Sequence, residues 1–227
     1  MKSTCKKSLI CLIALLSLCM AAYPQNLKVY SGPFTPLKGG NVTYQYRDAP
    51  DGSRIFEGDF NFTGNGSSPL RVKGQFKNDC QIGYWIWDYG YGHIVEITFS
   101  EQGCKFECKG LGRTNASYIK GTVGKILREP RMITSYDLYD AGIGRVLQMK
   151  WDASGKQSGP WKVKMNKKEP LYTRNEMSGK WFYVKESTGD KEERSDIGGL
   201  QTAMDEAEAW IWSELRPCIM RSTFKHR

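Results

Sequence analysis

Histidine is almost missing from this sequence, and this limits the catalytic chemistry that the chain can carry. Its 227 residues include two histidines, His93 and His226. A Ser-His-Asp or Cys-His nucleophile would have to use His93, because His226 lies in the basic C-terminal tail. The chain also lacks a Gly-x-Ser-x-Gly elbow and a strand–Gly-x-Gly-x-x-Gly–helix unit, the signatures of α/β-hydrolases and of dinucleotide binding. We therefore predict no catalytic residue and no cofactor.

Paired carboxylates carry little information in this chain. Two correctly placed carboxylates are enough for glycoside hydrolysis, and Asp88, Glu96 and Glu107 could supply them. With 24 acidic residues, however, some such pair is expected in any fold. The sequence therefore favours a protein that is not an enzyme.

Long apolar runs are lacking once the N-terminus is passed. The chain begins with three lysines, continues with an apolar run over residues 9–22 and ends this run with the small residues Ala21 and Ala22. This order is typical of a secretory signal peptide, and the run is short for a membrane span. We predict that residues 1–22 are a signal peptide, cleaved after Ala21 or Ala22, and that the mature chain has no transmembrane span. The protein would then be exported to the periplasm, the cell surface or the extracellular space; a retained anchor helix is the alternative.

A strong excess of one charge is also absent. The full chain has a formal net charge of +9, and removal of the three signal-peptide lysines lowers it to +6. The remaining basic residues are spread along the chain, and no recognition helix or RNA-binding motif accompanies them. We therefore expect no nucleic-acid partner. A protein or an envelope component is expected instead, and anionic glycans or lipid headgroups in peripheral membrane contact suit a mildly basic surface.

Cysteine becomes scarce after the signal peptide. Cys80, Cys104, Cys108 and Cys218 remain in the mature chain. An even number in an exported protein permits two disulfides. Cys104 and Cys108 lie four residues apart in a strand-like segment, which separates them by about 13 Å against a limit of about 7 Å for a disulfide. We expect Cys80 to pair with one of them. A zinc site is not expected, because the chain has no Cys-x-x-Cys and no neighbouring histidine pair.

What the chain does have is a recurring combination of glycine and aromatic residues. One unit reads aromatic or apolar residue, x, Gly, x, Phe, and the other reads turn, Gly, x, Trp, strand. The first unit occurs at Gly32 and Phe34, Gly58 and Phe60, and Gly74 and Phe76, with a weaker copy at Gly121 and Val123; the second occurs at Gly83 and Trp85, Gly159 and Trp161, and Gly179 and Trp181. A glycine in a strand lets a neighbouring backbone or ring approach closely, so each Trp or Phe is expected to cover the glycine of the next hairpin. One hairpin is marginal alone, and several must stack to build a core.

This combination resembles the bacterial MORN-type repeats, in which Gly-x-Phe, a polar turn and Gly-x-Trp make one β-hairpin. The match is good over residues 56–87, partial over residues 150–184 and weak elsewhere, and the glycines are unevenly spaced. The resemblance implies a mainly β fold, an irregular antiparallel sheet of stacked hairpins. It also implies a non-enzymatic role, because MORN-type proteins are generally associated with protein–protein and membrane-proximal interactions.

Turn residues and alternating segments predict how the chain is organised. We expect strands over residues 42–46, 54–62, 71–76, 84–91, 94–99, 104–108, 118–123, 146–151, 161–165 and 181–184. They would form a repeat domain over residues 23–185, followed by a charged linker over residues 186–198. From residue 199 the apolar period becomes 3.6, which predicts one C-terminal α-helix, stopped by Pro217, in a final segment (residues 199–227) that ends in a basic tail. Its apolar face would hold Leu200, Ala203, Met204, Ala207, Ile211 and Leu215 and cover the sheet.

The densest aromatic run supplies the candidate binding residues. In a single strand, Trp85, Trp87, Tyr89 and Tyr91 would point to the same side. Such a row suits stacking on sugar rings, but it also suits the core of a repeat protein. The repeat pattern assigns Trp85 to the core, so the candidate ligand-binding residues are Trp87, Tyr89, Tyr91 and His93.

The sequence as a whole favours an exported, non-enzymatic binding or scaffold protein that mediates protein or envelope-surface interactions. A carbohydrate-binding or carbohydrate-active module that uses the aromatic patch is the alternative. A solvent-exposed aromatic row would favour the glycan, and burial of these side chains would favour the scaffold.

Overall fold

The computed structural model describes residues 26–37, 39–111, 116–126, 129–185 and 187–220. The expected signal peptide over residues 1–22 and the basic tail over residues 221–227 lie outside the described residues. Within the described ranges, no helix is both long enough and apolar enough to cross a bilayer.

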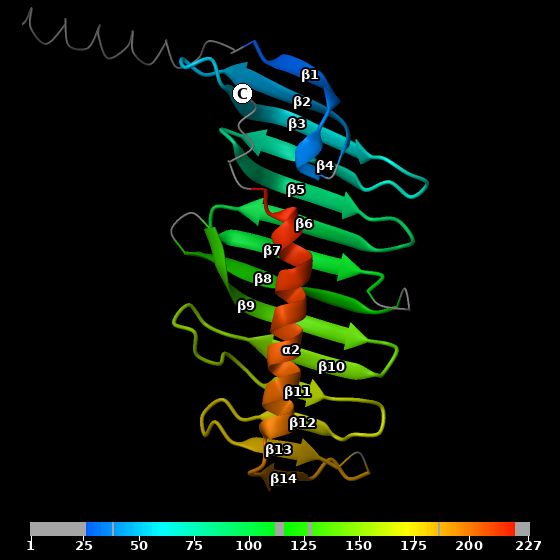
Figure 1. Ribbon diagram of the computed structural model, residues 1–227. Helices are drawn as coiled ribbons and strands as arrows, with labels where there is room; N and C mark the ends of the chain where they lie inside the picture. The colour runs from blue at the N-terminus through cyan, green and yellow to red at the C-terminus, as the bar shows by residue number, and fades with distance from the viewer. Residues whose placement is uncertain (1–25, 38, 112–115, 127–128, 186, 221–227) are drawn as a thin grey trace, which may run out of the picture.

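The described residues form one antiparallel sheet and one C-terminal α-helix, which confirms the expected fold class (Figure 1). The sheet has 14 strands, and each strand pairs with the next one in the sequence. The strands are β1 (Lys28–Pro33), β2 (Gly40–Asp48), β3 (Arg54–Gly64), β4 (Arg71–Lys77), β5 (Cys80–Asp88), β6 (Ile94–Ser100), β7 (Gly103–Lys109), β8 (Tyr118–Ile126), β9 (Glu129–Asp140), β10 (Arg145–Lys150), β11 (Trp161–Lys164), β12 (Leu171–Arg174), β13 (Trp181–Val184) and β14 (Lys191–Arg194). The helix is α2 (Gly198–Leu215), and the 3-10 helices η1 (Thr35–Leu37) and η2 (Arg216–Cys218) follow β1 and α2.

Each expected strand is present, but the sequence pattern does not predict β1, β9, β12 or β14. Strand β14 lies inside residues 186–198, the segment expected to be a charged linker, and it has no apolar alternation to reveal it. It pairs with β13 and is held by polar groups across the strands. Lys180 Nζ lies 2.8 Å from Glu193 Oε2, and the Tyr183 hydroxyl donates to Glu192 Oε2 at 2.5 Å.

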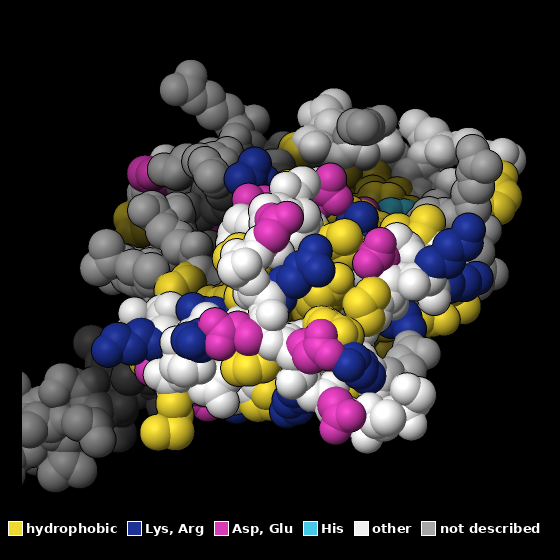
Figure 2. All heavy atoms as spheres, turned by 90° about the horizontal axis from the view of Figure 1, so that it is seen from below, with side chains coloured by type: hydrophobic (Ala, Val, Ile, Leu, Met, Phe, Trp, Pro, Cys, Tyr) yellow, Lys and Arg dark blue, Asp and Glu magenta, His cyan; other side chains and the backbone are white. Residues whose placement is uncertain are grey.

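The charge on β14 also suits its position as an edge strand. All four of its side chains are exposed, and Figure 2 shows basic and acidic side chains interspersed at this end of the molecule. Charged side chains on an edge strand oppose pairing with the edge of another sheet. The last strand therefore ends the sheet without exposing an apolar edge.

Alternation along the strands gives the sheet two different faces. On one face every second residue is buried, as at Val95 and Ile97 in β6 and Phe106 in β7. The residues between them, such as Glu96 and Lys105, point to the opposite side. We call the first side the core face and the second the open face.

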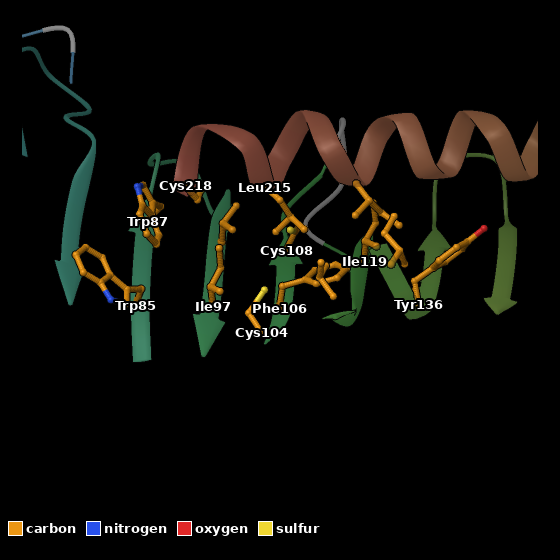
Figure 3. Close-up of a cluster of buried hydrophobic side chains, with 14 of the residues drawn as sticks. Trp85, Trp87, Ile97, Cys104, Phe106, Cys108, Ile119, Tyr136, Leu215 and Cys218 are labelled. Atoms are coloured by element: carbon orange, nitrogen blue, oxygen red, sulfur yellow. The ribbon is translucent and has the colours of Figure 1, made fainter. Parts of the chain in front are cut away.

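Helix α2 runs across the strands and covers the core face from β14 towards β5 (Figure 1). Figure 3 shows Trp87, Cys108 and Ile119 beneath the helix, with Leu215 and Cys218 at its C-terminal end. Burial of a large apolar side chain stabilises a fold by roughly 1.5–3 kcal/mol. The buried residues of α2 are Leu200, Ala203, Met204, Ala207, Ile211 and Leu215, so the apolar face predicted from the 3.6-residue period is confirmed.

Strands β1–β4 extend past the C-terminal end of α2, and there aromatic side chains pack on one another (Figure 1). Phe34 lies just beyond β1 with its ring centroid 5.7 Å from that of Phe60. The rings of Tyr44 and Phe56 are 4.7 Å apart, and those of Phe56 and Phe76 are 5.0 Å apart. Such pairs add about 0.5–1.5 kcal/mol each beyond area burial. Aromatic packing therefore builds the core where the helix does not reach.

The two repeat units use glycine for different reasons. A Cβ at Gly74 would lie 2.0 Å from Cδ2 of Trp85, so the ring covers this glycine. In the other unit Gly83, Gly159 and Gly179 have φ values of 61°, 90° and 67°, a backbone conformation that other residues rarely adopt. Gly74 is thus covered by Trp85 of its own hairpin and not, as expected, by a ring from another hairpin. The Gly-x-Trp glycines instead shape the chain just before each Trp. Of the repeat aromatics, Phe34, Phe60, Phe76, Trp85 and Trp181 are buried and Trp161 is half-buried.

We predict that Gly74→Ala lowers the free energy of unfolding by about 3 kcal/mol, because the added methyl group overlaps the Trp85 ring. Gly198→Ala is the matched control, since a Cβ at this first residue of α2 meets nothing closer than 3.8 Å, and its effect should stay within about 1 kcal/mol. Denaturant titration measures both. Equal stability of the two variants would contradict the role assigned to Gly74.

We also predict that deletion of residues 199–227 lowers the melting temperature and exposes surface that binds a hydrophobic dye. Two point variants separate this effect from simple truncation. Ile211→Asp buries an unpaired carboxylate under α2 and should have the same effect. Ala209→Asp places the same group on the exposed side of α2 and should be nearly neutral. Unchanged melting without dye binding in the truncated protein would mean that α2 serves a partner rather than the sheet.

Candidate functional site

The aromatic run does not lie in one strand, because β5 ends at Asp88. Trp85 and Trp87 belong to β5 and are 0% and 1% exposed. Their rings stack with centroids 5.2 Å apart, and Trp87 lies beneath α2 (Figure 3). A ligand cannot reach Trp87 while the helix covers it, so this candidate is part of the core.

Tyr89 and His93 join the β5–β6 hairpin to the C-terminal end of α2. Their rings stack with centroids 4.7 Å apart and an interplanar angle of 19°. His93 Nε2 lies 2.9 Å from Glu214 Oε2, and the Tyr89 hydroxyl lies 3.5 Å from Cys218 Sγ. Burial, followed by the nearby Cys218 thiol, holds the pKa of Tyr89 well above its ordinary value. These two candidates therefore anchor the end of the helix.

Tyr91 is the candidate whose ring is open to solvent. It lies at the tip of the β5–β6 hairpin and is 88% exposed. Its φ is 53°, and Gly90 and Gly92 beside it have φ values of 80° and 81°. The left-handed conformation costs a non-glycine residue about 1–2 kcal/mol. One isolated ring is not the row of aromatics that stacking on a glycan needs, so the four candidates do not assemble into one platform.

The open face of β4–β11 is rich in basic side chains. Strand alternation and register place there Arg71, Lys73, Lys77, Lys105, Lys109, Lys120, Lys150, Lys162 and Lys164. The acidic side chains on the same part of this face are Asp88, Glu96, Glu107 and Asp137. Basic groups outnumber carboxylates here, although the chain as a whole is only mildly basic.

A hollow of about 780 Å³ lies in the open face over β5–β10. Its size is within the range of small-molecule pockets, and polar and charged residues outnumber apolar ones in its lining. The lining includes the open-face residues Tyr84, Glu96, Thr98, Lys105, Glu107, Lys120, Thr122, Ser135, Asp137, Gln148 and Lys150, together with Ser158, Gly159 and Pro160 from the β10–β11 connection. The hollow therefore brings together side chains from six consecutive strands, β5–β10.

Glu96 is held in place on the β5 side of the hollow. The Tyr84 hydroxyl donates to Glu96 Oε1, and Lys109 Nζ donates to Glu96 Oε2 at 2.7 Å. The hydrogen bond from Lys109, followed by that from Tyr84, lowers the pKa of the Glu96 carboxyl. Burial first and the Glu96 carboxylate second raise the pKa of Tyr84 to about 12. At neutral pH this group is therefore a fixed carboxylate beside a neutral phenol.

A row of four cross-strand neighbours spans the hollow from β7 to β10: Lys105, Thr122, Ser135 and Lys150. Thr122 Oγ1 lies 2.7 Å from Ser135 Oγ. A bulge at Thr134 also brings the hydroxyl of Thr134 to 2.7 Å from Thr122 Oγ1. Lys105 and Lys150 form no ion pair with any residue that the structure describes. Three strand spacings separate them by about 14 Å. Two uncompensated cations thus flank a pair of hydrogen-bonded hydroxyls.

The sequence pattern alone does not reveal this surface. The signal that could have indicated it is the polar half of the alternation in β7, where Lys105, Glu107 and Lys109 separate the buried residues. That pattern shows that a strand has a polar side. It does not show which polar sides lie next to one another, because adjacency depends on the pairing of β5–β10.

The expected pairing of Cys80 with Cys104 or Cys108 is not formed. Cys80, Cys104, Cys108 and Cys218 are all free thiols. Strand β6 lies between β5 and β7. Two strand spacings alone separate Cys80 from Cys104 and Cys108 by about 10 Å, and the register adds a further offset along the strands, so a disulfide cannot reach. The described part of the chain also brings no three His, Cys, Asp or Glu residues together as a metal site.

Comparison with known proteins adds no functional information. No protein-family model, no curated protein and no solved structure matches the chain. The hairpin-rich sheet neither establishes nor excludes MORN-type repeats, so the resemblance stays a prediction.

We predict that a thiol reagent modifies one cysteine of the folded mature chain quickly and four after unfolding. Cys80 is exposed, whereas burial raises the pKa of Cys104 to about 11 and that of Cys218 to about 12 and also raises that of Cys108. Protonated buried thiols react slowly, because the thiolate is the nucleophile. Cys80→Ser should remove the fast phase and leave three slow thiols. Fewer than four reactive thiols after unfolding would mean that a disulfide has formed.

Proposed function

We propose that this chain is an exported, non-enzymatic binding or scaffold protein that presents the open face of its sheet to a partner at or beyond the cell envelope. The order of basic, apolar and small residues over residues 1–22 supports export. The observation that carries the binding role is the group of open-face lysines that have no ion pair among the described residues. Lys73, Lys77, Lys105, Lys120, Lys150 and Lys162 make up this group.

The stability of the fold does not explain why these open-face lysines have no ion pair among the described residues. Helix α2 and the aromatic core already bury the apolar side of the sheet, so the open face needs only to be soluble. Opposite charges across neighbouring strands stabilise a sheet, as Lys109 and Glu96 do here. A group of unpaired cations gains no such energy and repels itself, but it attracts an anionic partner.

Carbohydrate binding through the aromatic candidates Trp87, Tyr89 and Tyr91 has less support. Trp87 is buried beneath α2, and Tyr89 and His93 are engaged with Cys218 and Glu214. A glycan, if it is the partner, would have to use another surface.

Photo-crosslinking from single positions tests the proposed use of the open face. A photoactivatable side chain at Lys73 or at Lys162 should give covalent adducts in the cells that make the protein, because both positions lie on the open face outside the hollow. The same side chain at Thr202 or Ala209, on the exposed side of α2, should give none. Adduct size on gels, with and without protease digestion, measures the outcome.

Adducts formed only from α2, or equally from both sides, would contradict the proposal. Adducts that resist protease digestion would indicate a partner that is not a protein. Each variant should be checked for unchanged melting first, so that crosslinking from a misfolded chain is recognised.

A further inference from the structure

The geometry points to the open-face hollow as the binding site for a stretch of an acidic polysaccharide, a sugar polymer that bears carboxylate groups. This inference rests on the proposed function and deepens it, because it names the class of ligand that the open face takes. It uses a surface that includes none of the candidate residues Trp87, Tyr89, Tyr91 and His93.

The cations of the hollow are suited to widely spaced anionic groups. Lys105 and Lys150 stand about 14 Å apart across β7–β10, without an ion pair among the described residues. Lys120 lies between them along the sheet, with Nζ 5.4 Å from the centroid of the Tyr118 ring. Cations at this separation suit an extended polyanion, which can reach both, rather than one compact anion.

The remaining polar groups are suited to hydroxyls. Sugar hydroxyls both donate and accept hydrogen bonds, and the hollow offers both functions. Thr122 and Ser135 supply hydroxyls between the two lysines, and Glu107 and Asp137 supply carboxylate acceptors two residues further along β7 and β9. A neutral glycan would leave Lys105 and Lys150 without partners, whereas an acidic glycan uses both kinds of group.

A nucleic-acid strand fits this lining less well. Its bases favour exposed aromatic rings on which to stack, and the lining of the hollow consists mainly of charged and hydroxyl-bearing side chains. The ring that the hollow exposes is that of Tyr84, and its hydroxyl is engaged with Glu96.

A bilayer surface also fits less well. Peripheral proteins bind anionic lipids through basic groups that reach a flat layer, commonly with apolar side chains that insert beside them. Here Lys105 and Lys150 line a hollow that residues 158–160 of the β10–β11 connection also line. An extended polymer can enter such a hollow, whereas a flat layer of headgroups cannot follow its shape.

Calorimetric titration of the purified protein with oligogalacturonate tests the inference. Three further probes share only part of its chemistry: the methyl-esterified oligomer keeps the hydroxyls without the charge, polyglutamate keeps the charge without the sugar, and phosphatidylglycerol vesicles present anionic headgroups. Oligogalacturonate should bind about tenfold or more tightly than each of the others, and added salt should weaken its binding.

Paired variants assign the binding to the hollow. Lys105→Gln with Lys150→Gln should weaken oligogalacturonate binding about tenfold, because the double variant loses both exposed lysine–carboxylate pairs. Lys167→Gln with Lys168→Gln removes the same charge from the exposed β11–β12 connection and should change the affinity by less than about twofold. Thr122→Val should weaken binding without a change of charge.

No binding of oligogalacturonate, equal binding of the esterified oligomer or polyglutamate, preference for vesicles, or equal losses in both double variants would each overturn the inference. The proposed function fails independently, through the absence of crosslinks from Lys73 and Lys162. Crosslinks from these positions together with no polysaccharide binding would leave the open face as a binding surface for a different partner.

Discussion

The burial of one face of a single sheet is the constraint on which the rest of this structure depends. A 14-stranded sheet exposes two faces, and the described chain supplies one long helix to cover one of them. Helix α2 buries Leu200, Ile211 and Leu215 against the core face, and aromatic rings complete the core over β1–β4. Nothing in the described chain covers the open face, and it accordingly carries most of the charged side chains of β4–β11.

This division separates the part of the molecule that gives stability from the part that is available for binding. Core-face residues such as Trp87 and Cys108 are closed off by α2. Open-face residues such as Lys105 and Lys150 can change with little effect on the core, because their side chains do not pack in it. The twist and bulges of the sheet hollow the open face and bring polar groups of several strands together.

The sequence was informative wherever a local pattern was sufficient. The apolar face of α2 follows from the 3.6-residue period, and the strands with alternating residues, such as β6 and β7, follow from the period of two. Strand β14 escaped prediction because an edge strand of charged residues buries no side chain. The candidate site was the weaker prediction. Tyr89 and His93 are aromatic and close in the sequence, which suggests a binding patch, but they contact Cys218 and Glu214, more than 120 positions away.

By itself, the sequence determined the mainly β class, the helix that covers the sheet and the glycines of the two repeat units. These depend on neighbours within a few residues, where backbone geometry and side-chain alternation decide the outcome. Only the tertiary structure decided which polar positions meet in the hollow, which aromatic side chains α2 closes off, and that β6 separates Cys80 from Cys104 and Cys108. Each of these depends on which strands lie side by side and on what covers them, and local periodicity carries no information about either.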